Sequence, residues 1–245
     1  MQTLFHMIAK RKSMRAFDSS LTLSSAELES VRDRFKALVP LYPDIKTRME
    51  IVPREQTGAL FGQHALLLFS EPGAQALLNC GYMLEQMDLW FASQDIGACW
   101  YGMAKEANTS DGLRFIIMQV FGKSKPQEFR QDFSETRRRS AATIWEGDFD
   151  PRVIEAARHA PSATNSQPWR VTSADGLITV RRTTRYLTYM PPRTRNSFNN
   201  IDMGIFLLVL ELALAEYGYT WQRELCDPAV KPKGGLVDVA RYVLT

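Results

Sequence analysis

The stretch Pro161–Trp169 reads PSATNSQPW and decides how the rest of this chain is interpreted. Prolines near both ends restrict its backbone, and Ser162, Asn165 and Gln167 supply one hydroxyl and two amides over a short distance. Because each amide offers an acceptor and two donors, such a loop suits a flat ligand whose edge carries both. Taken alone, the loop is explained about equally well as an ordinary turn leading into a strand, with Trp169 in the core.

The composition predicts a soluble globular chain with a sizeable core. The 245 residues match one large domain or two small ones, and 45% of them are hydrophobic. The 30 basic and 27 acidic residues nearly balance, giving a net charge of +3. A nucleic-acid-binding protein needs a concentrated basic face, so this composition gives no case for nucleic acid.

Cysteine and histidine usage argues against disulfides and metals. The three cysteines form no CxxC pair, and the three histidines are widely spaced. The N-terminus lacks the apolar segment of a secretory leader. The most apolar run, Gly204–Ala215, contains Glu211 and is too short to span a bilayer. We therefore expect no metal, no membrane and a cytoplasmic location.

Hydrophobic periodicity and capping signals predict the main elements. Ser24 and Glu27 have the spacing of a capping box, and Asp150 followed by Pro151 is typical of a helix start. Residues 123–139 are polar and basic, which indicates a surface connection. We expect helices over residues 3–9, 24–39, 74–95, 150–160 and 201–217, and strands over 65–69, 115–121, 177–181 and 219–223.

The chain also contains a candidate internal repeat. Two amphipathic helices are each followed by a glycine, two residues and a tryptophan, so Gly97 pairs with Gly218 and Trp100 with Trp221, at an offset of 121 (218 − 97). The basic runs that begin at Arg11 and Arg138 recur at a similar offset of 127 (138 − 11). Duplication predicts a pseudo-dimer, in which one half (about residues 1–130) faces the other (about residues 131–245).

Three motifs resemble the nitroreductase family of FMN flavoproteins. RKSMRAF at Arg11–Phe17 is similar to the family's RRSxRxF, and Ala156–Trp169 is close to its AAxxAPSxxNxQPW. The segment from Gly81 to Trp100 resembles the helix that ends in GLGTCW in the branch whose single chain mimics the usual homodimer. The resemblance covers about residues 4–221. It implies an α+β fold of mixed, mainly antiparallel sheet with long packed helices, in one domain over residues 1–245.

The resemblance also implies where FMN binds. In the family one subunit supplies the basic segment and the glycine turn, and the other supplies the PSxxN loop; here the two halves of the chain take these parts. Arginine suits phosphate and the polar edge of a ring, and glycine allows close backbone approach. Gln167 either contacts the ring or braces the loop, and Arg193 with Arg195 is an alternative to Arg138 with Arg139 at the phosphate. The residues expected to bind the cofactor are Arg11, Lys12, Ser13, Arg15, Gly97, Ala98, Arg138, Arg139, Pro161, Ser162, Asn165 and Gln167.

Several positions depart from the family pattern. Ala98 replaces the threonine of GLGTCW and Asp95 replaces its first glycine, so this chain lacks the hydroxyl that the family pattern offers to the flavin here. His159 occupies a position that is often aromatic, and we interpret it as a packing residue because no neighbour in the sequence orients it. Cys99 follows the branch pattern and is expected in the core. The first half has no PSxxN loop, so we expect one flavin site per chain.

The resemblance implies an FMN-dependent oxidoreductase that passes hydride from NADH or NADPH through the flavin to an electron-poor acceptor, such as a nitroaromatic or a quinone. In such enzymes the cofactor performs the chemistry, and no catalytic acid, base or nucleophile is assigned here. Two alternatives stay open: a flavin-binding or sequestering protein without turnover, and a small-molecule-binding pseudo-enzyme that has lost the cofactor. The chain is expected to be a monomeric pseudo-dimer or a homodimer.

Overall fold

The computed structural model describes residues 4–102, 111–185 and 191–245, and it contains two mainly antiparallel sheets. The first sheet lies in the N-terminal half, has the order β1-β2-β4-β3 and is antiparallel throughout. Its strands are β1 (Thr47–Pro53), β2 (His64–Ser70), β3 (Ile96–Tyr101) and β4 (Arg114–Lys123).

The second sheet lies in the C-terminal half and has the order β5-β6-β7-β9-β8. Its one parallel pair joins β5 to β6. Its strands are β5 (Trp145–Glu146), β6 (Trp169–Ala174), β7 (Leu177–Thr183), β8 (Trp221–Leu225) and β9 (Leu236–Leu244).

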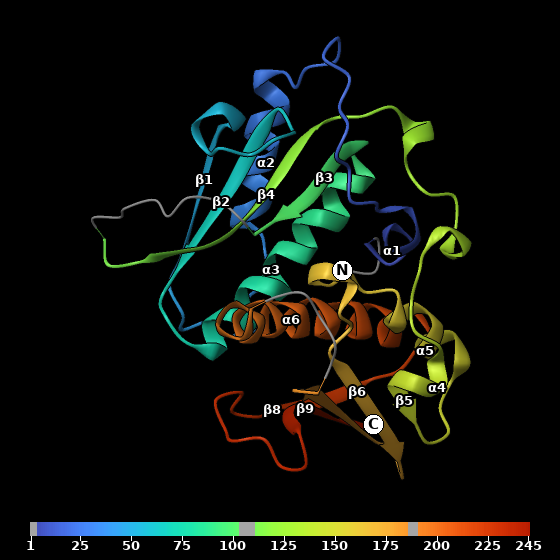
Figure 1. The fold of residues 1–245 in the computed structure, drawn as a ribbon. Coiled ribbons are helices and arrows are strands. Elements are labelled where there is room, and N and C mark those ends of the chain that lie inside the picture. The colour runs from blue at the N-terminus through green and yellow to red at the C-terminus, as the bar shows by residue number, and fades with distance from the viewer. Residues whose placement is uncertain (1–3, 103–110, 186–190) are drawn as a thin grey trace.

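Two long helices, α3 and α6, pack against each other between the two sheets (Figure 1). Most of their apolar side chains belong to one continuous apolar core. The shorter helices lie around them. The helices are α1 (Met7–Lys10), α2 (Ser25–Lys36), α3 (Ala74–Ser93), α4 (Ala141–Ile144), α5 (Pro151–Arg158) and α6 (Pro192–Glu216).

Both halves have the same topology. In the first, α3 follows β2 and precedes β3, and β2 pairs with β4; in the second, α6 follows β7 and precedes β8, and β7 pairs with β9. Each of these central pairs contains one register shift, after Leu68 in β2 and after Val180 in β7. The α+β fold and the duplicated arrangement predicted from the sequence are therefore confirmed, although the strands form two sheets instead of one.

The contact between α3 and α6 is reciprocal and depends on two glycines. A Cβ on Gly204 would lie 1.9 Å from the carbonyl oxygen of Leu78, and a Cβ on Gly81 would lie 2.0 Å from that of Ile201. Only glycine allows the backbones to approach this closely. Gly81 and Gly204 are 123 positions apart (204 − 81), and so are Leu78 and Ile201 (201 − 78).

The offset of 123 replaces the offset of 121 predicted from the sequence. At 123, Asp95 corresponds to Gly218 (218 − 95), and both residues have a left-handed backbone, with φ of 52° and 81°. Gly97, predicted to end a helix, instead lies inside β3, because α3 ends at Ser93. A Cβ on Gly97 would lie 2.2 Å from Ser124 Oγ, so close packing explains this glycine.

Local signals at the helix starts are confirmed. Ser24 and Glu27 form the capping box of α2, and the Asp150 side chain accepts a hydrogen bond from the Arg152 backbone N–H at the start of α5. Other boundaries were wrong. Of the helix expected over residues 3–9, Thr3 lies outside the described residues and α1 begins only at Met7. Helix α6 begins nine residues before the predicted start (201 − 192).

The segment 123–139, expected on the surface, is partly buried. Phe129 is 4% exposed, and the Arg130 guanidinium donates to the backbone carbonyl of Arg11 at 2.8 Å. The segment connects the halves and packs against the start of the chain.

Helix α6 is longer and more apolar than the sequence analysis predicted. Residues Thr194–Glu216 are long and apolar enough to cross a bilayer by composition, but 89% of the most apolar window is buried inside the protein. That burial is typical of a core helix.

The α3–α6 contact predicts the effect of Gly204→Ala. Alanine favours helix by about 1 kcal/mol over glycine, but its methyl group would overlap the Leu78 carbonyl. We expect a net loss of about 3 kcal/mol in the free energy of unfolding, measured by urea denaturation. The control Ser197→Ala, at an exposed position on α6, should change it by about 0.5 kcal/mol or less. A Gly204→Ala protein as stable as the parent would contradict the close approach.

Candidate functional site

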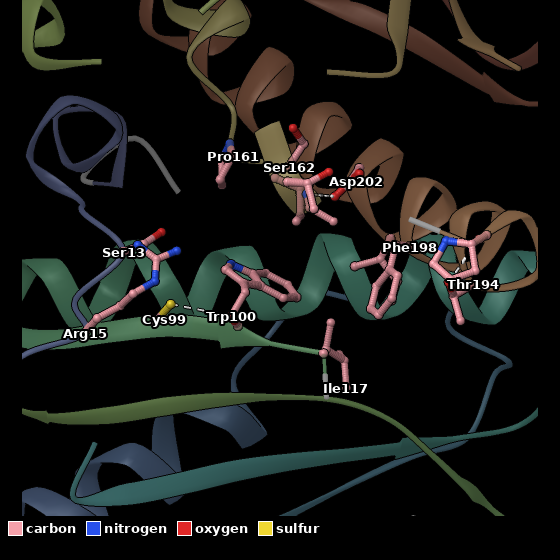
Figure 2. Close-up of a pocket in the computed structure, with 16 residues that line it drawn as sticks. Ser13, Arg15, Cys99, Trp100, Ile117, Pro161, Ser162, Thr194, Phe198 and Asp202 are labelled. Carbon is pink, nitrogen blue, oxygen red and sulfur yellow. Dashed lines mark hydrogen bonds between the residues drawn. The ribbon is translucent and has the colours of Figure 1, made fainter. Parts of the chain in front are cut away.

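A cavity of about 550 Å³ lies between the two halves of the chain. This volume is within the range of small-molecule and cofactor sites. Figure 2 shows side chains from both halves around it. From the first half come Ser13, Arg15, Cys99 and Trp100, and from the second come Pro161, Ser162, Phe198 and Asp202, among others.

The N-terminal segment reaches the cavity alongside β3. Ser13 forms a β-bridge with Ala98, and the Met14 N–H donates to the Ala98 carbonyl at 2.9 Å. Arg15 lines the cavity and is exposed. Within the described part of the chain no hydrogen bond or ion pair is made by the Arg15 guanidinium, so its charge is available to a ligand.

Arg11 lies behind the cavity in a buried ion pair. Its Nε is 2.9 Å from Asp88 Oδ2, both side chains are 2% exposed, and its guanidinium also donates to Ser13 Oγ at 3.1 Å. Trp100 Nε1 donates to the same Asp88 carboxylate at 3.1 Å. Arg11 thus fixes Ser13 and connects the segment to α3.

A second carboxyl adjoins this pair. Glu85 is fully buried, and neither of its oxygens has a hydrogen-bond partner among the residues that the structure describes. Burial, and then the neighbouring Asp88 charge, raise the pKa of Glu85 well above its usual range. Burial raises the pKa of Asp88 as well, but its direct contact with Arg11 opposes that shift and favours its charged form.

The loop after α5 has an unusual backbone. Thr164, Asn165 and Gln167 all have positive φ, at 51°, 56° and 49°. Non-glycine residues in this region are strained, and such residues cluster at functional sites. The strain persists because neighbouring contacts determine the loop. The Gln167 N–H, for example, donates to Ser162 Oγ at 2.9 Å.

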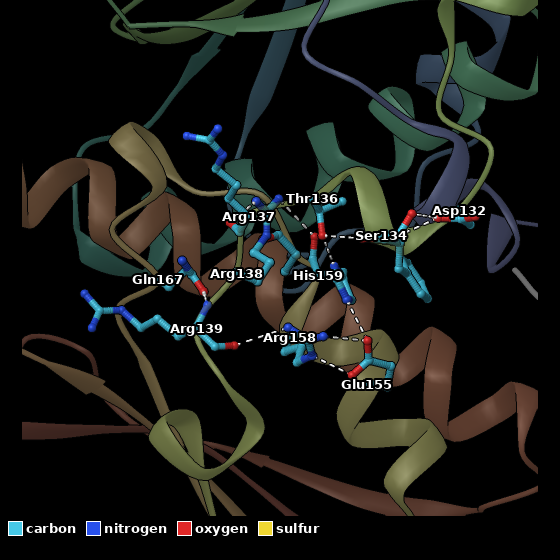
Figure 3. Close-up of polar contacts among 12 residues, drawn as sticks. Asp132, Ser134, Thr136, Arg137, Arg138, Arg139, Glu155, Arg158, His159 and Gln167 are labelled. Atoms are coloured by element: carbon cyan, nitrogen blue, oxygen red, sulfur yellow. Dashed lines mark hydrogen bonds and ion pairs between the residues drawn. The ribbon is translucent and has the colours of Figure 1, made fainter.

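The linker ahead of α4 holds the loop from one side (Figure 3). Gln167 Oε1 accepts from the Arg139 N–H at 2.8 Å, and the Asn165 amide donates to the Arg137 carbonyl at 2.9 Å. The Arg138 guanidinium donates to Asn165 Oδ1 at 3.2 Å and to the carbonyls of Ala160 and His159. These side chains brace the loop, as one of the two alternatives for Gln167 predicted.

His159 belongs to the same network and is oriented by its neighbours. Its Nδ1 lies 2.6 Å from Thr136 Oγ1 and its Nε2 lies 2.9 Å from Glu155 Oε1, while its ring stacks on Phe133. The expectation that no neighbour in the sequence orients it was therefore wrong. Glu155 lies one helical turn earlier on α5, and Thr136 is brought in by the segment 123–139. Burial lowers the pKa of His159 to about 4, so the ring is neutral near pH 7.

The cavity has a cationic end and large apolar side chains farther along. Ser13 and Arg15 lie at one end, Trp100 and Ser162 face each other in the middle, and Phe198 lies towards the other end (Figure 2). The Phe198 ring packs on the backbone of Gly102, where a Cβ would lie 2.6 Å from it. A ligand with a charged or hydrogen-bonding part and a flat apolar part matches this arrangement.

Four of the residues predicted to bind a cofactor line the cavity: Ser13, Arg15, Pro161 and Ser162. The others lie around it. Lys12 is exposed and donates to the Glu128 carbonyl, and the side chain of Arg193 lies outside the described residues. Gly97, Ala98 and Arg11 support the N-terminal segment, while Arg138, Arg139, Asn165 and Gln167 support the loop.

Most other residues that line the cavity, Asp202 and Phe198 among them, were missed by sequence reasoning. Asp202 and Phe198 are on α6, whose first two turns were not predicted as helix. A signal that could have pointed to Asp202 is an acidic residue at the start of the apolar part of this helix. Cys99, expected in the core, is buried but borders the cavity, and burial raises the pKa of its thiol.

Comparison with known proteins identifies what the chain is similar to. A family model described as "Putative TM nitroreductase" matches residues 3–214. The chain also resembles the crystal structure of a protein from Thermotoga maritima titled a putative nitroreductase, with 19% identity, a TM-score of 0.64, and coverage of 98% of this chain and 93% of that one. No curated protein matches the sequence.

Shorter nitroreductase family proteins match about half of the chain. One from Clostridium novyi has 14% identity and a TM-score of 0.43, covering 55% of this chain and 98% of that one. One from Clostridium difficile has 13% identity and a TM-score of 0.44, covering 57% of this chain and 95% of that one.

The lowered pKa of His159 predicts a loss of stability in mild acid. The unfolded chain binds a proton at His159 near pH 6.5, while the folded chain does so only near pH 4. Stability therefore falls as pH drops through this window, by roughly 3 kcal/mol from this residue. Urea denaturation from pH 7 to 4 should show the fall, and His159→Gln should show a smaller one. Equal pH dependence in both proteins would contradict the assignment.

Proposed function

We propose, from the premise that the chain belongs to the "Putative TM nitroreductase" family, that it is an FMN-dependent oxidoreductase. Its reductant would be NADH or NADPH, and its acceptor an electron-poor compound such as a nitroaromatic or a quinone. When bound, FMN supplies the hydride and electron transfer chemistry, which the protein's side chains do not provide.

The observation that carries the proposal is the composition of the cavity. Ser13 and Arg15 from the first half and Pro161 and Ser162 from the second half line one space. These are the parts that two subunits contribute in the family. The two halves of one chain therefore supply both sides of one site.

The residues present fit a flavin. Arg15 offers a positive charge without a partner in the described part of the chain, and guanidinium groups bind phosphate and ring oxygens well. The Ser162 hydroxyl accepts from Gln167 and keeps its own hydrogen to donate into the cavity. The cavity is mainly apolar elsewhere, which suits a flat ring system.

The protein's part would be to bind, orient and exclude water. The strained loop holds Ser162 and Pro161 in place, and the Arg11–Asp88 pair holds Ser13. A cation at the end of the cavity would stabilise negative charge that develops on a reduced ring. Trp100 and Phe198 border the space left for an acceptor.

An absorption spectrum of the purified protein, recorded before and after adding NADPH or NADH under argon, tests the proposal. We expect flavin bands, either as purified or after incubation with FMN, and we expect them to bleach with the reductant. Bands that persist would favour a flavin-binding protein without turnover. A protein that stays colourless after incubation with FMN would overturn the cofactor assignment.

Arg15→Gln should weaken FMN binding. A charge-assisted hydrogen bond contributes about 1.5–3 kcal/mol, so the dissociation constant should rise roughly tenfold or more. Quenching of FMN fluorescence measures it. The matched control is Arg32→Gln, because Arg32 is an exposed arginine on α2 that pairs with Glu29. Equal losses in both variants would point to net charge instead of a contact at the cavity.

A further inference from the structure

Asp202 on α6 is a cavity-lining carboxyl that contacts the strained loop Pro161–Gln167. Its Oδ1 accepts from the Ala163 N–H at 2.8 Å, and its Oδ2 lies 3.3 Å from Ser166 Oγ. The side chain is 2% exposed, and within the described residues it has no ion pair. A buried carboxylate without a cation is costly, whereas the protonated acid is not.

The first half of the chain contains a counterpart of Asp202. At the offset of 123 set by the α3–α6 contact, Asp202 corresponds to Asn79 on α3 (202 − 79). Asn79 Oδ1 accepts from the N–H groups of Leu41 and Tyr42, at 2.8 and 3.0 Å, in the loop that follows α2. Both halves therefore use a side-chain oxygen on the long helix to hold the loop after the preceding short helix.

The comparison with Asn79 bears on whether Asp202 holds the loop as a neutral acid or as a charged carboxylate. An asparagine is neutral and accepts through its oxygen, as a protonated carboxyl does. Asn79 makes its loop contacts through Oδ1 alone, and its Nδ2 has no partner among the described residues. We propose that Asp202 acts as a neutral carboxylic acid that positions the Pro161–Gln167 loop, accepting from Ala163 and donating to Ser166. Burial raises the pKa of Asp202 well above its usual range, in agreement with this form.

The charges nearby do not offer Asp202 a partner. Arg15 on the N-terminal segment and Cys99 on β3 face the same cavity, and Arg138 on the linker is bound to loop carbonyls and Asn165. On α3, Asp88 pairs with Arg11, and burial raises the pKa of Glu85. None of these charged groups is among the causes of the raised pKa of Asp202.

By positioning the loop, Asp202 also affects FMN binding, an effect that rests on the proposed function. Ser162 and Pro161 precede Ala163 directly, so their place at the cavity depends on the Ala163 contact. Ionisation of Asp202 would remove the proton given to Ser166 and put an uncompensated charge beside the cavity. We therefore expect FMN affinity to fall as pH rises through the pKa of Asp202.

The first test uses the protein without flavin. The unfolded carboxyl ionises near pH 3.9, while folded Asp202 keeps its proton, so this residue lowers stability as pH rises from 4. Asp202→Asn should melt at the same temperature as the parent near pH 4 and at a higher temperature at pH 7. An exposed control, Asp175→Asn in the β6–β7 turn, should show no such difference. The proposal would be overturned if Asp202→Asn melted at a lower temperature than the parent and if this difference in melting temperature increased with pH.

The second test follows the loop and the cofactor. By hydrogen exchange, the Ala163 amide should stay protected in Asp202→Asn and exchange at least tenfold faster in Asp202→Ala. Ser166→Ala, a milder change, should weaken protection less than Asp202→Ala.

FMN dissociation constants between pH 5 and 9 should rise with pH for the parent and stay constant for Asp202→Asn. A dissociation constant of Asp202→Asn that rises with pH as the parent's does would contradict the role of Asp202. If no variant or parent binds FMN, the proposed function fails while the flavin-free tests still decide the role of Asp202.

Discussion

The close approach of α3 and α6 is the constraint on which the rest of the structure depends. Two glycines let each backbone reach a carbonyl of the other helix, so the two helices sit at a fixed register. That register places β3 and the N-terminal segment on one side of a cavity and the loop after α5 on the other. Interiors packed at this density do not absorb shifts easily, so the cavity's shape is set by the helix pair.

The two halves share a plan and differ in chemistry. At the offset of 123, Asp88 corresponds to Glu211 (211 − 88), and both are buried carboxyls on the long helices. Each contacts a residue of the following strand twelve positions on, Trp100 in one half and Arg223 in the other. In the first half Arg11 supplies the counterion, while in the second Arg223 does so and two tyrosine hydroxyls add hydrogen bonds. The contact between the long helix and the following strand occurs in both halves, which indicates that it supports the fold. The counterions differ, and in the first half Arg11 also holds Ser13 at the cavity.

Local signals were readable from the sequence, and long-range partners were not. The capping box at Ser24 and the helix start at Asp150 depend on neighbouring residues, and both were predicted. The loop motif likewise identified Pro161 and Ser162 at the cavity. The role of Gly97 was misassigned because Asp95 has the left-handed backbone that ends helix α3. A glycine usually occupies that position after a helix. Asp88, Thr136 and Ala163, which contact Arg11, His159 and Asp202, come from distant segments, and no spacing in the sequence reveals them. Glu155 is different, because it lies one helical turn before His159 and its spacing was readable.

Comparison of the two loops explains why the cavity lies beside the loop of the second half and not beside its counterpart in the first. The residue whose N–H reaches the α6 carboxyl is Ala163, which lines the cavity, whereas the residue whose N–H reaches Asn79 is Leu41. Leu41 is 3% exposed and packs in the main core. A large apolar side chain at this point joins the core, and a small one leaves space beside the backbone. A loop of small residues needs external contacts to hold its shape, because it has few apolar groups to bury. The Arg138 side chain, the backbone N–H of Arg139 and the carboxyl of Asp202 provide those contacts, so the loop keeps a defined shape beside an open cavity.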